Sequence, residues 1–406
     1  MLSRRFRGAA LALAAISLSA CASQVDGSAR PGEIDVRTLN VGKYATAPLE
    51  ERYAYHYDMS GGFNLALARL ADQVVTGPEI DPKFKYGTGS IPFLDSAKAT
   101  KTLADVAAPV LDRNGLMFGV AVGHSEKEAD KKTGKSPEGS AFTTVTVMQF
   151  PDAASAKQAA DELDEADFNV AADRNERVSL SKYPEAKAHW RPGVASIGAS
   201  IARGNYVVEL YAGTGEAEIG KLTALAEQIY NAQLPLLDAL PPLDREGVLR
   251  LPADPDGLLR RTLNADGIGT PDVTSQVTVG VRGYQHRISD QDYTGRVLRD
   301  HGVDRIAVSG ASYSGVSLLY RTRDAETAGK LRKQLLERAF PGAAEAPAGV
   351  PAAECGESAA GKSGSGKRFR CALTYQRFTA TVEADQLADV HQKAAAQYAL
   401  LANSTW

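Results

Sequence analysis

The same series of apolar and polar patterns occurs twice along this chain. They alternate over residues 143–150 and again over 315–322, as in half-buried β-strands. After each of these segments an Asp-Ala pair opens an amphipathic helix pattern, at 152–163 and at 324–335. The repeated order predicts two related halves, in which matched segments take matched positions.

Each half continues through an irregular segment to a predicted β-hairpin and a closing helix. In the first half the hairpin falls on 194–213 and the helix on 219–237. In the second half they fall on 368–384 and 386–403. Strands joined by hairpins favour antiparallel pairing over a parallel, doubly wound sheet. The predicted fold class is α+β: two related halves, each an antiparallel sheet with helices packed on one face.

The N-terminus has the pattern of an export signal. Three arginines among the first seven residues precede an apolar run at 9–18, which is too short to span a bilayer. The run ends in Leu18-Ser19-Ala20-Cys21, which looks like the lipobox of bacterial lipoproteins. We expect cleavage between Ala20 and Cys21 and a diacylglyceryl group on the Cys21 thiol, which would anchor the chain in the membrane. A plain secretory signal with an incidental cysteine is the alternative.

Length and composition predict the domain organisation. Removing the predicted signal peptide, residues 1–20, leaves a chain too long for one ordinary core. Small polar residues predict a flexible tether over 21–38. A first α+β domain is expected over 39–240, a Pro-rich linker over 241–257, and a second α+β domain with a disulfide loop over 258–406.

The charge balance excludes one class of partner. Residues 1–20 hold three arginines and no acidic residue, so their removal changes the formal net charge from −3 to −6. An acidic chain without a dense basic stripe is a poor nucleic-acid binder, because such binding needs many phosphate contacts. We expect a lipid-anchored protein on the extracytoplasmic face of the cell membrane, with no nucleic-acid partner.

The remaining cysteines, Cys355 and Cys371, lie close together in the sequence. Outside the cytoplasm such a pair predicts a disulfide, worth on the order of 3 kcal/mol for so short a loop. Two free thiols are the alternative. Between them GESAAGKS, residues 356–363, satisfies the phosphate-loop string G-x-x-x-x-G-K-[ST]. Prolines before it and glycines after it argue against the required strand and helix, so we expect no nucleotide.

Other chemistry-bearing patterns are weak. The six histidines show no metal-ligand spacing, so neither a metal nor another cofactor is expected, and His189 and His286 are expected at the surface or at a rim. The segment GASYSG approaches the nucleophile elbow G-x-S-x-G but has serine where the second glycine belongs. A serine-type hydrolase using Ser312 or Ser314 is therefore the alternative function.

The densest mixture of polar and aromatic residues is GVRGYQHRISD, at 280–290. Its candidate ligand-facing residues are Tyr284, His286, Arg287 and Asp290. A purely structural turn is the alternative interpretation of this segment.

Four segments together resemble a known family. They are the lipobox, LNVGKYATAP, ALARLADQVVTGPEIDPKF and GYQHRISDQDYTGRVLRDHGVD. The chain resembles lipoproteins of unknown activity from mycolic-acid-forming actinobacteria (mycobacteria, nocardiae and rhodococci), which implies an envelope protein. More loosely, the second half is similar to the extracellular sensor modules of mycobacterial receptor kinases, which are thought to bind a ligand in a cleft.

These observations predict a non-catalytic protein rather than an enzyme. We expect a ligand-binding or protein-interaction module of the cell envelope, attached to the membrane by its diacylglyceryl anchor. Its expected partner is an envelope lipid, glycan or protein. A serine-type envelope hydrolase and a structural envelope protein are the alternatives.

Overall fold

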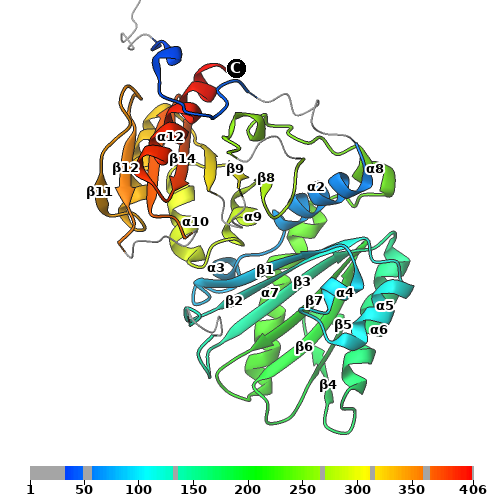
Figure 1. Cartoon of the computed structure of the whole chain (residues 1–406). Coiled ribbons are helices and arrows are strands. Elements are labelled where there is room, and N and C mark those ends of the chain that lie inside the picture. The colour runs from blue at the N-terminus through cyan, green and yellow to red at the C-terminus, as the bar shows by residue number, and fades with distance from the viewer. Residues whose placement is uncertain are drawn as a thin grey trace, which may run out of the picture. The chain divides into compact units, whose positions relative to one another are not determined.

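The computed structural model describes residues 33–48, 57–130, 136–265, 270–310, 316–359 and 366–404 (Figure 1). The chain divides into two compact units, Met1–Asp35 and Val36–Trp406, and the fold described below belongs to the second. The predicted cleavage and lipidation residues, Ala20 and Cys21, lie outside the described residues. Within the described ranges, no helix combines the length and apolar character needed to cross a membrane.

The first half contains an antiparallel sheet of seven strands in the order β1-β2-β3-β7-β6-β5-β4. Its strands are β1 (Tyr86–Phe93), β2 (Phe118–Ser125), β3 (Phe142–Gln149), β4 (Glu176–Leu180), β5 (Tyr183–Trp190), β6 (Ser196–Arg203) and β7 (Tyr206–Gly213). The β6–β7 hairpin turns at Gly204, whose φ of +54° is a conformation that glycine adopts without strain.

The second half contains another seven-stranded antiparallel sheet, which reads β8-β9-β10-β14-β13-β12-β11 from one edge. Its strands are β8 (Gln276–Val279), β9 (Arg305–Ser309), β10 (Ser317–Arg321), β11 (Gly342–Ala344), β12 (Glu354–Glu357), β13 (Phe369–Tyr375) and β14 (Phe378–Ala384). Taken strand by strand, this order is the order of the first sheet. The predicted fold of two related antiparallel halves is confirmed.

Matching helices follow matching strands. The helices are α2 (Met59–Ala71), α3 (Gly77–Ile80), α4 (Ser96–Ala99), α5 (Ala108–Arg113), α6 (Ala153–Asn169), α7 (Ile219–Asp238), α8 (Arg245–Leu249), α9 (Val281–Gln285), α10 (Gln291–Asp300), α11 (Ala325–Glu337) and α12 (Leu387–Ala402), with 3₁₀ turns η1 (Val36–Thr38), η2 (Asp105–Ala107) and η3 (Leu259–Arg261). The Asp-Ala repeat is a helix cap: Asp152 accepts a hydrogen bond from the Ser155 amide, and Asp324 accepts one from Thr327, both at 2.8 Å.

Helices cover both faces of each sheet, whereas one face was predicted. In the first half, Ala121 and Met148 pack with α6 on one face, while Val120 and Val147 pack with α7 on the other. In the second half, α11 and α12 both contact β13 and β14. The inner strands are buried along almost their whole length, so apolar residues on both faces must be removed from water.

The predicted linker 241–257 is fastened to the first half. Gln149 donates to the Leu243 carbonyl at 2.7 Å and accepts from the Leu243 amide at 3.1 Å. Within the linker, α8 packs on α2, and Val248 is fully buried. The division into separate domains over 39–240 and 258–406 stays a prediction about independent folding.

Contacts also join α2 to the second half. The Asp72 carboxylate, at the end of α2, accepts hydrogen bonds from the amides of Gly280 at 2.8 Å and Gly283 at 3.2 Å. Burial raises the pKa of Asp72 to about 6, although these two amides act in the opposite direction. The carboxylate holds the turn between β8 and α9, which leads directly into the predicted ligand-facing segment.

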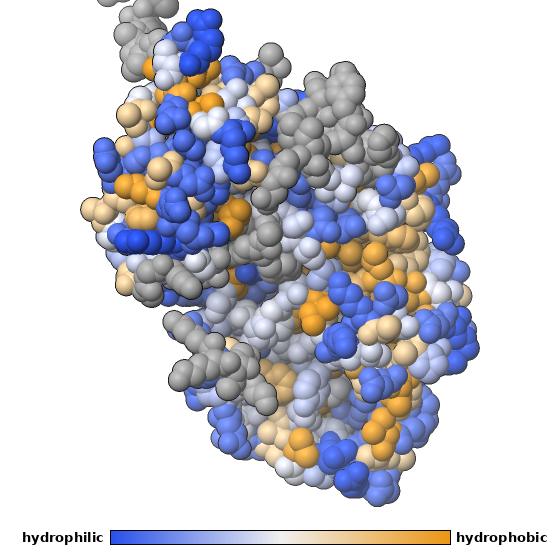
Figure 2. Space-filling view, viewed as in Figure 1, coloured by the Kyte–Doolittle hydropathy of each residue, from blue (hydrophilic) through white to orange (hydrophobic). Residues whose placement is uncertain are grey.

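Charged and polar residues are spread over the face drawn in Figure 2, with apolar residues in smaller groups between them. The large hydrophobic side chains that are exposed come from separate parts of the chain: Tyr57, Leu94, Val106, Val170, Val194 and Tyr211. Single exposed apolar residues of this kind are normal for a folded protein surface.

Candidate functional site

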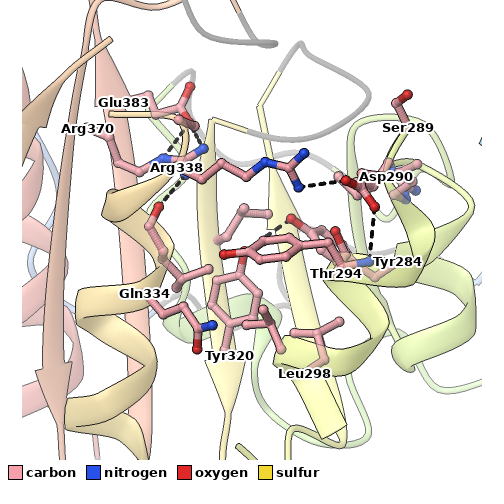
Figure 3. Close-up of a pocket in the computed structure, with 17 residues that line it drawn as sticks. Tyr284, Ser289, Asp290, Thr294, Leu298, Tyr320, Gln334, Arg338, Arg370 and Glu383 are labelled. Atoms are coloured by element: carbon pink, nitrogen blue, oxygen red, sulfur yellow. Dashed lines mark hydrogen bonds and ion pairs between the residues drawn. The ribbon is translucent and has the colours of Figure 1, made fainter. Parts of the chain in front are cut away.

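A cavity of about 610 Å³ lies in the second half, on the face of the sheet that α10 and α11 cover (Figure 3). Its lining comes from the segment 284–298, from β10, from the last turn of α11 and from the neighbouring strands β13 and β14. Sites for small molecules are usually a few hundred to about a thousand Å³, so this cavity has the size of a ligand site.

The four predicted ligand-facing residues separate into two groups. Tyr284, Arg287 and Asp290 line the cavity, whereas His286 does not. His286 is buried, and its Nε2 donates to the Val74 carbonyl at 3.0 Å. Its ring lies 6.3 Å from that of His124, and burial lowers the pKa of His286 to about 4 and that of His124 to about 3, so both rings are neutral. The expected surface or rim position of His286 is wrong.

A buried ion pair forms one wall of the cavity. Arg370 on β13 and Glu383 on β14 are direct cross-strand partners, so their side chains extend from the sheet together. The Arg370 Nε donates to Glu383 Oε1 at 2.8 Å, Nη2 donates to the same oxygen, and Nη1 donates to the Leu335 carbonyl at 2.9 Å. Glu383 is 3% exposed and Arg370 17% exposed, so both charges are largely removed from water.

A second ion pair connects the two helices beside the cavity. Arg338, the residue that follows α11, donates from Nη1 to Asp290 Oδ2 at 2.6 Å. The other carboxylate oxygen of Asp290 accepts from the Tyr293 amide at 3.0 Å and so caps α10. The Arg338 guanidinium also lies over the Tyr293 ring, 4.6 Å from its centre. Figure 3 shows Arg338 reaching toward Asp290.

Two buried tyrosines and a group of aliphatic side chains complete the lining. The hydroxyls of Tyr284 and Tyr320 lie 3.1 Å apart, and their rings meet edge to face. Burial raises the pKa of both phenols above the ordinary value. These hydroxyls therefore stay protonated at neutral pH and serve as hydrogen-bonding groups rather than as bases. The aliphatic part of the lining is Ile288, Val297, Leu298, Leu318 and Leu335.

Four residues of the cavity were not predicted from the sequence: Tyr320, Arg338, Arg370 and Glu383. For the last two a signal exists, because Arg370 and Glu383 lie at equal distances from the turn of a predicted hairpin. Opposite charges at such positions indicate a cross-strand pair. For Arg338, which reaches the cavity from the end of a helix, we find no comparable signal.

A second charged cluster lies in the first half. The His189 Nδ1 donates to Asp164 Oδ1 at 2.9 Å, and Nε2 lies 3.4 Å from Asp167 Oδ2. Arg177 pairs with the other oxygen of Asp164. His189 is only 8% exposed, so its expected surface or rim position is wrong. Burial acts to lower the pKa of His189, but the hydrogen bonds to Asp164 and Asp167 raise it to about 9. The ring is therefore charged at neutral pH and is no general base.

This cluster predicts a pH-dependent stability. Because the folded-state pKa of His189 lies above the ordinary value of 6.5, its contribution is complete below pH 6.5 and is lost as the pH rises through 9. In the wild type we expect this loss to lower the free energy of unfolding by about 1–3 kcal/mol between pH 6 and pH 10. The variant His189→Gln should not show this decrease. Urea unfolding at several pH values measures it, with His301→Gln as the control. An unchanged pH profile in the His189 variant would refute the assignment.

The predicted disulfide between Cys355 and Cys371 is confirmed, and the two cysteines are cross-strand partners on β12 and β13. The ring of His391 lies close enough for its nitrogen to join the two sulfurs as a third metal-ligand atom. However, the sulfurs are bonded to each other, and the His391 Nε2 donates to the Glu345 carbonyl at 2.6 Å. In this state the group offers no thiolate to a metal.

The phosphate-loop string is in the wrong structural context. Its first residues, Gly356 and Glu357, belong to β12, which corrects the expectation that no strand precedes the motif. Residues 360–365 lie outside the described residues, and the next described element is β13. A phosphate loop connects a strand to the N-terminus of a helix, whereas this segment connects two strands of one antiparallel sheet. Ser312 and Ser314 lie outside the described residues as well, so the hydrolase alternative stays a prediction.

Comparisons with known proteins give a family without an activity. Residues 53–253 match the N-terminal part, and residues 258–404 the C-terminal part, of a family described as a domain of unknown function, DUF7373. No curated protein matches the chain. Among solved structures, the extracellular domain of PknH from Mycobacterium tuberculosis is similar at 14% identity, over 46% of this chain and 100% of that chain, with a TM-score of 0.26. The two family matches extend over most of the sequence, and the chain belongs to the DUF7373 family.

Proposed function

We propose that this chain is a non-catalytic ligand-binding module of the cell envelope, which takes a small ligand into the cavity of its second half. A lipid group on Cys21 would hold it on the extracytoplasmic face of the membrane, as the lipobox and the export signal before it suggest. The observation that carries the proposal is the difference between the two halves at matched positions.

In the first half, apolar side chains cover the sheet face that corresponds to the cavity face of the second half. Side chains of α5 and α6 pack there against the sheet in one apolar cluster, which includes Met148 and Val207 on neighbouring strands. At the matched positions of the second half stand Tyr320 and Thr379, and α10 and α11 leave the 610 Å³ cavity. An unfilled cavity costs stability, so one that persists where the related half is packed is a feature expected of a binding site.

The Arg370–Glu383 ion pair has no counterpart at the matched positions of the first half. Arg370 and Glu383 form the sixth residue pair counted from the turn of their hairpin. The sixth pair of the first-half hairpin is Gly198 and Tyr211, neither of which is charged. Polar groups placed in an otherwise apolar cavity are what gives a small-molecule site its orientation and specificity.

The lining supports binding rather than catalysis. It contains no histidine, lysine or cysteine among the described residues. Its two carboxylates are held in ion pairs with arginines, and its buried tyrosines keep their protons. Nucleophilic catalysis needs a hydroxyl or thiol within hydrogen-bonding reach of a base, and in the described lining both carboxylates are instead paired with arginines.

A variant that fills the cavity tests the proposal. Gln334 is a half-buried lining residue on α11, and replacing it by tryptophan places an indole in the cavity. We expect full-length protein to bind the uncharged dye Nile red saturably at one site, and Gln334→Trp to weaken this binding at least about tenfold. Fluorescence titration measures the affinity, and circular dichroism checks that the variant is folded.

Lys330→Trp is the matched control, because Lys330 is an exposed residue of the same helix that does not line the cavity. It should leave Nile red binding unchanged. Equal affinities of the wild type and Gln334→Trp, with both proteins folded, would show that the cavity is not the binding site and would overturn the proposal.

A further inference from the structure

We infer that the ligand is an anionic amphiphile, whose carboxylate or phosphate group binds Arg338 and Arg370 while its apolar chain lies between α10 and α11. This inference rests on the proposed function and specifies the chemistry of the ligand. It follows from the division of the lining into an apolar and a charged part, and from the hydrogen bonds that Arg338 and Arg370 make.

The apolar part is large enough for a hydrocarbon chain. Val297 and Leu298 from α10, Leu318 from β10 and Leu335 from α11 line one continuous space. A fully polar ligand, such as a free sugar, would leave these side chains without an apolar partner. Burying a chain against them is worth roughly 0.8 kcal/mol for each methylene group, so several methylenes give substantial affinity.

The charged part of the lining consists of arginines and carboxylates. Among the described residues, three arginines and two carboxylates line the cavity: Arg287, Arg338, Arg370, Asp290 and Glu383. Two of the arginines are paired with the two carboxylates, at Arg338–Asp290 and Arg370–Glu383. An anionic group on the ligand would bind through arginine N–H groups that these pairs leave unused or can release.

The arginines differ in what they can offer to a ligand. The Arg287 guanidinium donates to the carbonyls of Val273 and Thr274, so it fixes the loop before β8. Arg370 uses three of its five N–H groups on Glu383 and Leu335, and among the described residues one N–H remains on each terminal nitrogen. These two N–H groups are donors that a carboxylate or phosphate oxygen can accept from.

Arg338 is the more exposed of the two arginines. Its side chain is 59% exposed, and its only described hydrogen bond goes to Asp290. A ligand anion can replace Asp290 on Arg338 at little cost, because Asp290 keeps its other bond, to the Tyr293 amide, and is 25% exposed to solvent. An exposed ion pair of this kind is worth about 1 kcal/mol or less, whereas charge-assisted bonds to a partly buried anion are stronger.

Matched twelve-carbon probes test the inference. The protein used is the full-length chain with Cys21→Ala. This substitution prevents acylation, so no detergent is needed to keep an acylated N-terminus in solution. Isothermal titration calorimetry compares dodecanoate, dodecyl phosphate and dodecan-1-ol at concentrations below micelle formation. We expect one binding site, and an affinity for at least one of the two anions about tenfold or more above that for the alcohol. The stronger of the two anions identifies the head group as a carboxylate or a phosphate.

Arg338→Gln should weaken binding of the preferred anion about tenfold and leave binding of dodecan-1-ol unchanged. Arg296→Gln is the matched control, because Arg296 is exposed on α10, pairs with Asp292 and does not line the cavity. It should change neither affinity. Binding of the alcohol as tightly as both anions, or an Arg338→Gln variant with unchanged anion affinity, overturns the anionic class.

The two proposals fail in different ways. If Nile red binds in a manner that Gln334→Trp blocks, while neither anion binds better than dodecan-1-ol, the cavity is a ligand site and only the anionic class is wrong. If Gln334→Trp changes the binding of no probe, then the cavity is not the site, and both proposals are overturned.

Discussion

Replacing Arg370 by methionine is expected to lower the free energy of unfolding by about 3–5 kcal/mol. The substitution leaves the Glu383 carboxylate, only 3% exposed, without the guanidinium that donates to it. A buried charge that loses its partner keeps its full desolvation cost, and the Leu335 carbonyl loses a donor as well. Urea denaturation of the variant and the wild type at pH 7 measures the difference.

The double variant Arg370→Met, Glu383→Met separates two explanations of that loss. If the loss comes from the orphaned carboxylate, removing both charges should restore most of the stability, because apolar replacements of a buried ion pair are often neutral. Restored stability combined with weakened binding of the dodecyl anion would then mean that the pair is kept for recognition. A double variant as unstable as the single one would instead show that the ion pair itself stabilises the fold.

Much of the fold could be predicted from the sequence because the repeated signals are local. Alternation at 143–150 and 315–322 and the Asp caps at 152 and 324 depend only on neighbouring residues, and they appear where expected. The second layer of helices could not be predicted in this way. Whether a strand is covered on one face or both depends on elements distant in sequence, and alternation weakens when both faces are buried.

The candidate site was only partly predictable for a related reason. The composition of 280–290 indicated Tyr284, Arg287 and Asp290, which line the cavity. The same composition included His286, which instead packs beside His124 and hydrogen-bonds to the Val74 carbonyl. Sequence gives the polarity of a segment, whereas burial is decided by what packs against it. A cavity is harder still to predict from the sequence, because it is space that side chains leave empty. Here it becomes evident only by comparison with the matched positions of the first half.

The disulfide between Cys355 and Cys371 should hold the edge of the second sheet in place. β12 has four residues and β11 only three, so few backbone hydrogen bonds attach this edge to β13. The bridge joins the two strands at a directly opposed pair and closes a loop with a sequence separation of 16. By limiting the unfolded ensemble, a bridge over such a loop contributes about 3 kcal/mol.

Replacing both cysteines by alanine is therefore expected to lower the free energy of unfolding by about 3 kcal/mol and to expose the amides of β11 and β12 to hydrogen exchange first. Urea denaturation of the Cys21→Ala chain with and without reductant gives the same comparison without mutating the bridge. The double alanine variant is the control, because reductant should not affect it. Cysteines that react as free thiols in the unreduced, denatured chain would contradict the bridge. Equal stability with and without reductant would mean that the short edge strands hold by packing alone.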